Sequence, residues 1–236
     1  MFSMEAHNKT LISKFMHELK TPLAIVRSHL ENEINNNSLS PKLQKKLAFD
    51  IEELARINNL INEMNFLLNP ERSCKREQFH SESLLAILVD LIEFINPIAE
   101  EKKQKISLIA NENIEYFIHK EKFQQLLLNL LTNAIKYTPN FGTIVIKLSH
   151  NETEIQISIK DSGIGMSEEQ QKHIFEPFYR INTEHTQGLG LGLSIVQAIV
   201  EQHQIKLKVK SQLDQGTTST LYLQKEKKDV CKTLDC

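Results

Sequence analysis

Hydrophobic residues recur at spacings of three and four along the first third of the chain, which predicts amphipathic helices. The first stripe begins at Ile12 and continues through Phe15, Leu19, Leu23, Val26, Leu30 and Ile34. A polar run at residues 35–38 interrupts it. Ser40 and Pro41 then start a second helix, because serine is a favoured N-cap and proline suits the first helical position. Its stripe is Leu43, Leu47, Ile51, Leu54, Ile57, Ile61, Met64 and Leu68. Asn69 ends this helix, because the residue before Pro70 avoids helical geometry.

The two stripes predict a helical hairpin over residues 1–70. A lone hairpin cannot bury both stripes, so we expect a second copy to complete a four-helix bundle in a homodimer. The alternative is that the hairpin packs on the C-terminal part of the same chain.

The pattern changes after a charged and polar linker at residues 71–79. Helical periodicity predicts helices at 83–101, 121–137 and 194–202. Residue composition and alternation of apolar and polar positions predict strands at 106–109, 114–118, 144–148, 155–159, 205–210 and 217–223. Strands and helices that follow an all-helical start predict an α+β chain, with a second domain at 80–225 and a free tail at 226–236.

Composition narrows the functional classes. The chain has 236 residues, 40% hydrophobic and 25% charged, with a net charge of −2, which lacks the basic surface that a nucleic-acid partner needs. No apolar run approaches the roughly 18–20 residues that span a bilayer, and the first ten residues lack the apolar centre of a signal peptide. The three cysteines form no CxxC pair, which fits a reducing compartment. We expect a cytoplasmic chain without nucleic acid and without membrane contact by this segment.

His17 lies on the polar side of the first predicted helix. At about 100° per residue it points roughly 140° away from the apolar stripe, and Thr21 shares that side. A neutral imidazole can attack phosphorus through one nitrogen while a base takes the proton of the other, and Glu18 suits that base. Pro22 predicts a bend just after His17. The alternative is a solvated histidine beside a solvated glutamate.

Asn129 and Asn133 are four residues apart and share one face of a predicted helix. An amide oxygen of Asn133 can bind Mg²⁺, which takes few protein oxygens together with water and phosphate. Lys136 can neutralise phosphate charge, and Tyr137 offers an aromatic face to a base. The alternative is two asparagines on the wet side of an amphipathic helix.

Asp161 follows directly after a predicted strand and can accept a hydrogen bond from an exocyclic amine such as adenine N6. Gly163 and Gly165 allow the backbone to approach a flat ligand closely. A second glycine set precedes the last predicted helix and can bind phosphate through its amides: Gly188, Gly190 and Gly192. Each glycine set alone also fits a turn without a ligand.

Residues 175–180 place Phe175, Phe178 and Tyr179 in a polar loop between the two glycine sets. Such a loop can act as a lid that closes over a bound nucleotide, with Arg180 reaching the γ-phosphate or a partner domain. The alternative is an apolar cluster that anchors a long loop.

Five segments, in this order, resemble the sequence boxes of the sensor histidine kinases of two-component systems. HELKTPL at 17–23 resembles their H box and NLLTNAIKYTP at 129–139 their N box. DSGIGM at 161–166 and GLGLGL at 188–193 resemble their two glycine boxes, and FEPFYR at 175–180 their F box. The resemblance covers residues 11–223, which is nearly the whole chain.

The resemblance implies a dimerisation and phosphotransfer domain at 1–70 and an ATP-binding domain at 80–225. The second would be the α/β sandwich that histidine kinases share with type II topoisomerases, Hsp90 and MutL. The implied activity is ATP- and Mg²⁺-dependent autophosphorylation of His17, followed by transfer to an aspartate of a response regulator receiver domain. The chain could be the cytoplasmic portion of a membrane-bound sensor.

The resemblance also implies roles for the matched residues. His17 would be the phosphoacceptor and Glu18 its acid/base, while Thr21 matches the position linked to phosphatase action. Asn133 would be the Mg²⁺ ligand and Asn129 its catalytic neighbour. The nucleotide would be bound by Lys136, Tyr137, Asp161, Gly163, Gly165, Arg180, Gly188, Gly190 and Gly192.

Two rival functions stay open at this point. An ATPase of the same superfamily without histidine transfer would use the same nucleotide residues but would not need an exposed His17 and Glu18. A non-catalytic dimeric scaffold for a regulator would be expected to lose its nucleotide residues, yet Asn133 and Asp161 are present.

Overall fold

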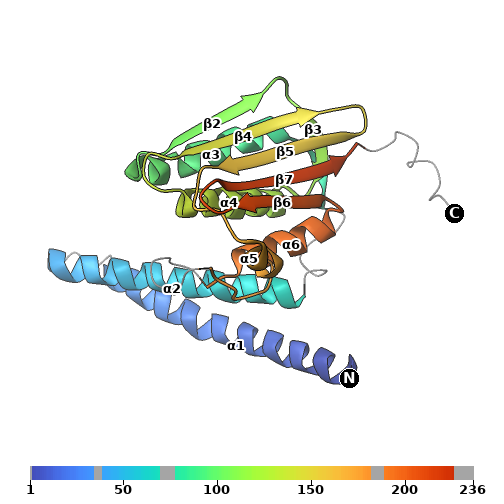
Figure 1. Cartoon of the computed structure of the whole chain (residues 1–236). Coiled ribbons are helices and arrows are strands. Elements are labelled where there is room, and N and C mark those ends of the chain that lie inside the picture. The colour runs from blue at the N-terminus through green and yellow to red at the C-terminus, as the bar shows by residue number, and fades with distance from the viewer. Residues whose placement is uncertain (1, 35–38, 70–77, 182–188, 226–236) are drawn as a thin grey trace. The chain divides into compact units, whose positions relative to one another are not determined.

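The computed structural model describes residues 2–34, 39–69, 78–181 and 189–225 (Figure 1). The chain forms two compact units, Met1–Ser73 and Cys74–Cys236, and each is described by itself. Most of the predicted linker and the whole predicted tail lie outside the described residues. None of the described helices is long and apolar enough to cross a bilayer.

The first unit is a pair of helices that pack against each other, α1 (Phe2–Ile34) and α2 (Pro41–Leu68). The predicted start of α2 is confirmed, because Oγ of Ser40 accepts a hydrogen bond from the backbone N–H of Leu43 at 3.4 Å. Helix α1 continues through Pro22 to its end. Both helices end where the sequence predicts.

Several large apolar side chains of this helical pair stay exposed, at fractions between 41% and 61%. They are Ile25, Val26, Leu43, Phe49 and Ile57. Exposed large apolar side chains on both helices are available for contact with another protein element.

The second unit is a five-stranded mixed sheet with a layer of helices on one face (Figure 1). The strand order is β2-β4-β5-β7-β6, and only the β2–β4 pair is parallel. The strands are β2 (Lys105–Ala110), β4 (Thr143–His150), β5 (Glu154–Asp161), β6 (Lys206–Gln212) and β7 (Gly216–Gln224). The covering helices are α3 (Leu84–Glu101), α4 (Lys120–Tyr137) and α6 (Gly192–Gln202).

Alternate residues of the central strands are buried on the face that the helices cover. In β4 and β5 these are Ile144, Ile146, Leu148, Ile155, Ile157 and Ile159. Each buried side chain of this size stabilises the fold by about 1.5–3 kcal/mol, and a slip of one residue would expose the whole set. Asp161 continues the same alternation at the end of β5, so the apolar register fixes a carboxylate on the buried face.

Two short elements were not predicted. Strand β1 (His80–Ser83) pairs antiparallel with β3 (Glu115–Ile118) in a separate two-stranded sheet. Its sequence, His-Ser-Glu-Ser, has no apolar alternation, so the pairing depends on the distant β3. Helix α5 (Glu168–His173) lies between the two glycine sets. It is too short for a period, but Ser167 and Gln170 form a capping box that could have indicated its start.

Candidate functional site

The C-terminal half of α4 carries the polar side chains of the candidate site. The opposite face of the helix packs into the core through four buried leucines, Leu126, Leu127, Leu130 and Leu131. The amide of Asn129 lies against the start of α6, since a Cβ added to Gly192 would be 3.5 Å from Asn129 Oδ1. Nδ2 of Asn129 is buried and donates no hydrogen bond within the described residues. A buried amide nitrogen of this kind is suited to a bound polar ligand.

Two cations meet near the end of α4. Burial lowers the pKa of Lys136, and the nearby charge of Arg180 lowers it further. Nζ of Lys136 lies 5.2 Å from the centroid of the Tyr137 ring. Arg180 comes from the loop after α5, so the fold brings two sequence-distant cations to one place. Two neighbouring positive charges provide an electrostatic reason to bind an anion there.

Asp161 is buried, with 8% of its surface exposed. Its Oδ1 accepts hydrogen bonds from the backbone N–H of Gly163 at 2.8 Å and of Thr217 at 3.0 Å. Burial raises the pKa of Asp161, and these two hydrogen bonds act in the opposite direction. Because both bonds go to Oδ1, the orientation of the carboxylate is fixed, and Oδ2 takes part in neither.

The glycines after Asp161 are required by close backbone contacts. A Cβ on Gly163 would lie 2.7 Å from the carbonyl oxygen of Tyr137, which brings the end of α4 against this segment. Gly165 has a φ of +64°, and a Cβ there would lie 1.8 Å from the carbonyl oxygen of Gln212. No larger residue fits at either position without a backbone shift.

The loop with the aromatic residues contacts the second glycine set. The backbone N–H of Phe178 donates to the carbonyl of Gly190 at 3.0 Å. Phe178 itself has a φ of +68° and is 56% exposed, which is uncommon for a large side chain. Such a strained and exposed aromatic fits a segment that changes conformation on binding. Gly188 lies outside the described residues.

Several of the predicted nucleotide residues therefore lie near the C-terminal half of α4, although they belong to segments that are far apart in sequence. The structure links these segments in three places. Asn129 lies beside Gly192, the charge of Arg180 acts on Lys136, and the carbonyl of Tyr137 lies against Gly163. His17, Glu18 and Thr21 belong to α1 in the other unit. The side chains of Glu18 and Thr21 are exposed, whereas the side chain of His17 lies outside what the structure describes.

One contributor was missed in the sequence. Thr217 supplies the second backbone donor to Asp161, since β7 pairs with β5. The signal is weak, because a backbone N–H carries no residue identity. Gly216, which precedes Thr217, has a φ of +85°.

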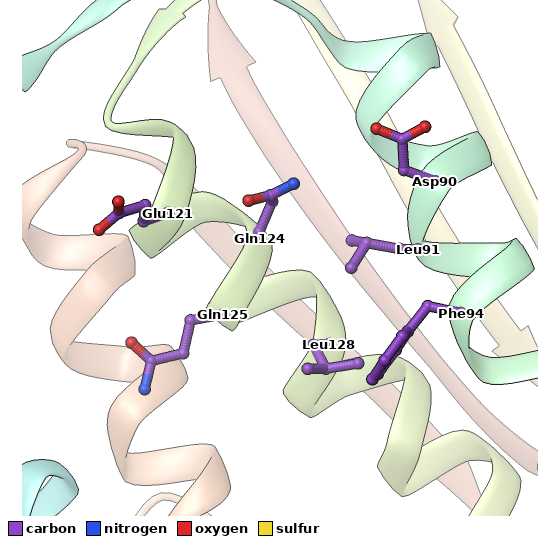
Figure 2. Close-up of a pocket in the computed structure, with 7 residues that line it drawn as sticks. All are labelled: Asp90, Leu91, Phe94, Glu121, Gln124, Gln125 and Leu128. Atoms are coloured by element: carbon purple, nitrogen blue, oxygen red, sulfur yellow. The ribbon is translucent and has the colours of Figure 1, made fainter. Parts of the chain in front are cut away.

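A separate cavity of about 420 Å³ lies between α3 and α4 (Figure 2). It is lined by Asp90, Leu91, Phe94, Glu121, Gln124, Gln125 and Leu128. Three of these residues belong to α3 and four to the first half of α4, so the cavity is distinct from the candidate site at the end of α4. The described residues contain no group of three or more histidine, cysteine, aspartate or glutamate side chains that could hold a metal ion.

Residues 118–227 match the family described as histidine kinase-, DNA gyrase B-, and HSP90-like ATPase. Sensor protein SrrB of Staphylococcus aureus is 30% identical over 235 residues, which covers 94% of this chain and 39% of the relative. The chain thus spans about two fifths of the length of the curated relatives it matches.

Solved structures share the fold. A full-length structure of ShkA in complex with AMPPNP has a TM-score of 0.77 at 22% identity, covering 91% of this chain and 45% of that one. The histidine kinase AdeS of Acinetobacter baumannii has a TM-score of 0.62 at 22% identity, with 88% and 97% covered. The catalytic domain of ThkA has a TM-score of 0.56 at 25% identity, with 62% and 95% covered.

These findings confirm the predicted resemblance and the α+β fold with a helical region before a mixed-sheet ATPase domain. The chain is homologous to sensor histidine kinases, and its residues 118–227 match the ATPase domain family named for histidine kinases, DNA gyrase B and HSP90.

Proposed function

We propose that this chain is an ATP-dependent protein histidine kinase that phosphorylates its own His17 and passes the phosphoryl group to an aspartate of a response regulator. The observation that carries the proposal is the arrangement around the end of α4, where the charge of Arg180 acts on Lys136 and the Tyr137 carbonyl lies against Gly163. The N–H of Gly163 in turn binds the Asp161 carboxylate. We interpret the two cations as an anion site and the carboxylate as the group that recognises adenine. Homology to sensor histidine kinases supports the same reading.

The residues around α4 fit ATP with Mg²⁺. Asp161 accepts from adenine N6, Tyr137 offers its ring, and Lys136 and Arg180 neutralise phosphate charge. Asn133 offers one amide oxygen, and the lack of a carboxylate cluster among the described residues suits an ion held mainly by phosphate and water. The buried Nδ2 of Asn129 is a donor available to a ligand. When bound, Mg²⁺ would neutralise charge on the phosphates.

The transfer step can then be written for the residues of this chain. A lone pair on one imidazole nitrogen of His17 forms a bond to the γ-phosphorus while the bond to the β–γ bridging oxygen breaks and ADP leaves. Glu18 takes the proton from the other ring nitrogen, so that the phosphohistidine is neutral in the ring. Catalysis is mainly positioning and charge stabilisation, because little covalent chemistry is asked of the protein.

We assign the parts of the chain accordingly. Residues 1–70 form the dimerisation and phosphotransfer domain, and residues 80–225 form the nucleotide-binding domain. Residues 71–79 are the linker between them, and residues 226–236 are the C-terminal tail. The exposed apolar side chains of the helical pair favour a homodimer through this unit. Thr21, which is exposed on α1, would assist hydrolysis of the phosphorylated regulator. The chain would act in the cytoplasm, alone or as part of a membrane-bound sensor.

Incubation with γ-labelled ATP and Mg²⁺ tests this function. We expect acid-labile, base-stable label on the wild-type chain and none on His17→Gln. His29→Gln is the matched control, because His29 is an exposed histidine of the same helix and has no part in the proposed chemistry. Label that persists on His17→Gln at the wild-type level would refute the assignment, and an ATPase without histidine transfer would hydrolyse ATP without retaining label.

A further inference from the structure

The C-terminal end of α4 has carbonyl groups that need hydrogen-bond donors, as every helix end does. The carbonyl of Ala134 is bound by the N–H of Thr138 at 3.1 Å, and that of Tyr137 by the N–H of Ile164 at 3.2 Å. The remaining carbonyls belong to residues Ile135 and Lys136 and to Thr138 just after the helix. Side chains from another segment satisfy all three.

Lys102 supplies most of these donors. Its Nζ lies 2.7 Å from the carbonyl oxygen of Ile135, 3.1 Å from that of Lys136 and 2.6 Å from that of Thr138. An ammonium group has three donors, and here each has a carbonyl acceptor. A positive charge is also favoured at this end of a helix, where the helix dipole is negative.

Gln104 completes the arrangement from a buried position, with 6% of its surface exposed. Its Nε2 donates to the carbonyl of Ile135 at 3.0 Å and to that of Thr138 at 2.6 Å. The carbonyls of Ile135 and Thr138 therefore each accept from both Lys102 and Gln104. The buried Oε1 of Gln104 has no hydrogen-bond partner within the described residues, so the amide is held through Nε2 alone, and its two short bonds tie it to the helix end.

The segment that carries both donors is itself held in place. The N–H of Lys102 donates to the carbonyl of Ala99 at 3.1 Å, and the N–H of Gln104 to the same carbonyl at 2.9 Å. In return, the N–H of Phe141 donates to the carbonyl of Lys102 at 3.1 Å. The turn between α3 and β2 and the end of α4 are thus bonded in both directions.

The helix end that is held in this way is also the centre of the proposed nucleotide site. Lys136 and Tyr137 project from this turn of α4. The Tyr137 carbonyl binds the N–H of Ile164 and contacts Gly163, whose own N–H binds Asp161. A shift of the last carbonyls would therefore reach the cation, the aromatic ring and the carboxylate together.

We propose that Lys102 and Gln104 are positioning residues for nucleotide binding, which fix the last turn of α4 relative to Asp161 without touching the nucleotide. The inference depends on the proposed function, because it assigns these residues to the ATP site of the same kinase. It predicts that their loss weakens ATP binding and raises the KM for ATP more than it lowers kcat for autophosphorylation.

The test compares Lys102→Met, which keeps the length of the side chain and removes its donors, with Lys102→Arg, which keeps the charge and donors. The Kd for ATP is measured by calorimetry on the full chain, and KM and kcat by labelled phosphate on His17. Loss of the three donated bonds predicts a Kd at least about tenfold higher for Lys102→Met, kcat within about twofold, and partial recovery for Lys102→Arg. Lys105→Met is the matched control, since Lys105 is exposed and its side chain makes none of these bonds.

An unchanged Kd for Lys102→Met would overturn the positioning role. Loss of the cooperative thermal transition in Lys102→Met would also overturn it, because the role would then be structural. Gln104→Leu is a second test of the same role. We expect a smaller increase in the Kd for ATP than in Lys102→Met, and an unchanged Kd would contradict the inference for Gln104. A wild-type chain that binds ATP but leaves His17 unlabelled would overturn the kinase function while the binding comparison still decides the role of Lys102.

Discussion

Asp161→Asn offers a sharp test of how this chain recognises its nucleotide. Two backbone donors, the N–H groups of Gly163 and Thr217, bind Oδ1 at 2.8 and 3.0 Å. An asparagine in this position keeps those bonds only if its carbonyl oxygen takes the place of Oδ1. Its Nδ2 is then forced into the place of Oδ2, so the group that faces the base changes from an acceptor to a donor.

The size of the effect follows from that exchange. A hydrogen bond from adenine N6 to a carboxylate contributes about 1.5–3 kcal/mol, so its loss predicts ATP binding about 10- to 150-fold weaker. Inosine triphosphate carries a carbonyl oxygen at C6, which accepts from Nδ2 of the asparagine. We therefore expect the preference for ATP over inosine triphosphate to shrink by at least the same factor in Asp161→Asn.

The fold should survive the substitution. Because burial raises the pKa of Asp161, a neutral amide avoids the desolvation that disfavours the charged carboxylate, and the apo melting temperature should stay the same or rise. Kd values for both nucleotides and melting curves provide the assay, with the exposed Asp90→Asn as the matched control. An Asp161→Asn chain that stays folded and keeps the wild-type preference for ATP would refute the assignment of Asp161 to adenine.

Two further outcomes follow from the side chains of the two units. His203 is buried and binds the Ile199 carbonyl at 3.0 Å and the His119 N–H at 3.2 Å, and burial lowers its pKa, with the charge of His119 adding to this. The free energy of unfolding therefore holds the full contribution of neutral His203 above about pH 6.5, the pKa of a histidine in the unfolded chain. That contribution is lost as the pH falls below this value, by up to about 1.4 kcal/mol per pH unit for this group. Urea melts at several pH values should show a shallower loss for His203→Gln, and equal slopes would contradict this. Thr21→Ala should lower the rate of hydrolysis of the phosphorylated regulator by about tenfold or more, which corresponds to the loss of one hydrogen bond. Labelling of His17 should stay near the wild-type level. An unchanged hydrolysis rate would show that Thr21 has no part in that step.

Local signals in the sequence were sufficient for most of the fold. Ser40 and Pro41 placed the start of α2, and alternation placed β4 and β5, because caps and periodicity depend on neighbouring residues. Strand β1 was missed because it is stabilised by pairing with β3, which lies far along the chain. Helix α5 was missed because six residues cannot establish a helical period.

The candidate site could be predicted in its residue types but only partly in its arrangement. Asp161 and the glycines stand out by chemistry, and the register of β5 explains why the carboxylate is buried. The approach of Arg180 to Lys136 depends on how a loop returns to α4, which no local pattern contains. Lys102 and Gln104 escaped notice for a related reason, because their partners are backbone carbonyls and carry no sequence signature.

The central claim is that the nucleotide site of the ATPase domain delivers phosphate to one histidine of α1. Tandem mass spectrometry at neutral pH, after incubation of the chain with ATP and Mg²⁺, tests it most directly by locating the modified residue. We expect phosphate on His17 in the wild type and much less in Asp161→Ala at an ATP concentration near the wild-type Kd, because loss of the carboxylate weakens ATP binding. Phosphate on another residue, or on His17 at full level in Asp161→Ala, would contradict the account.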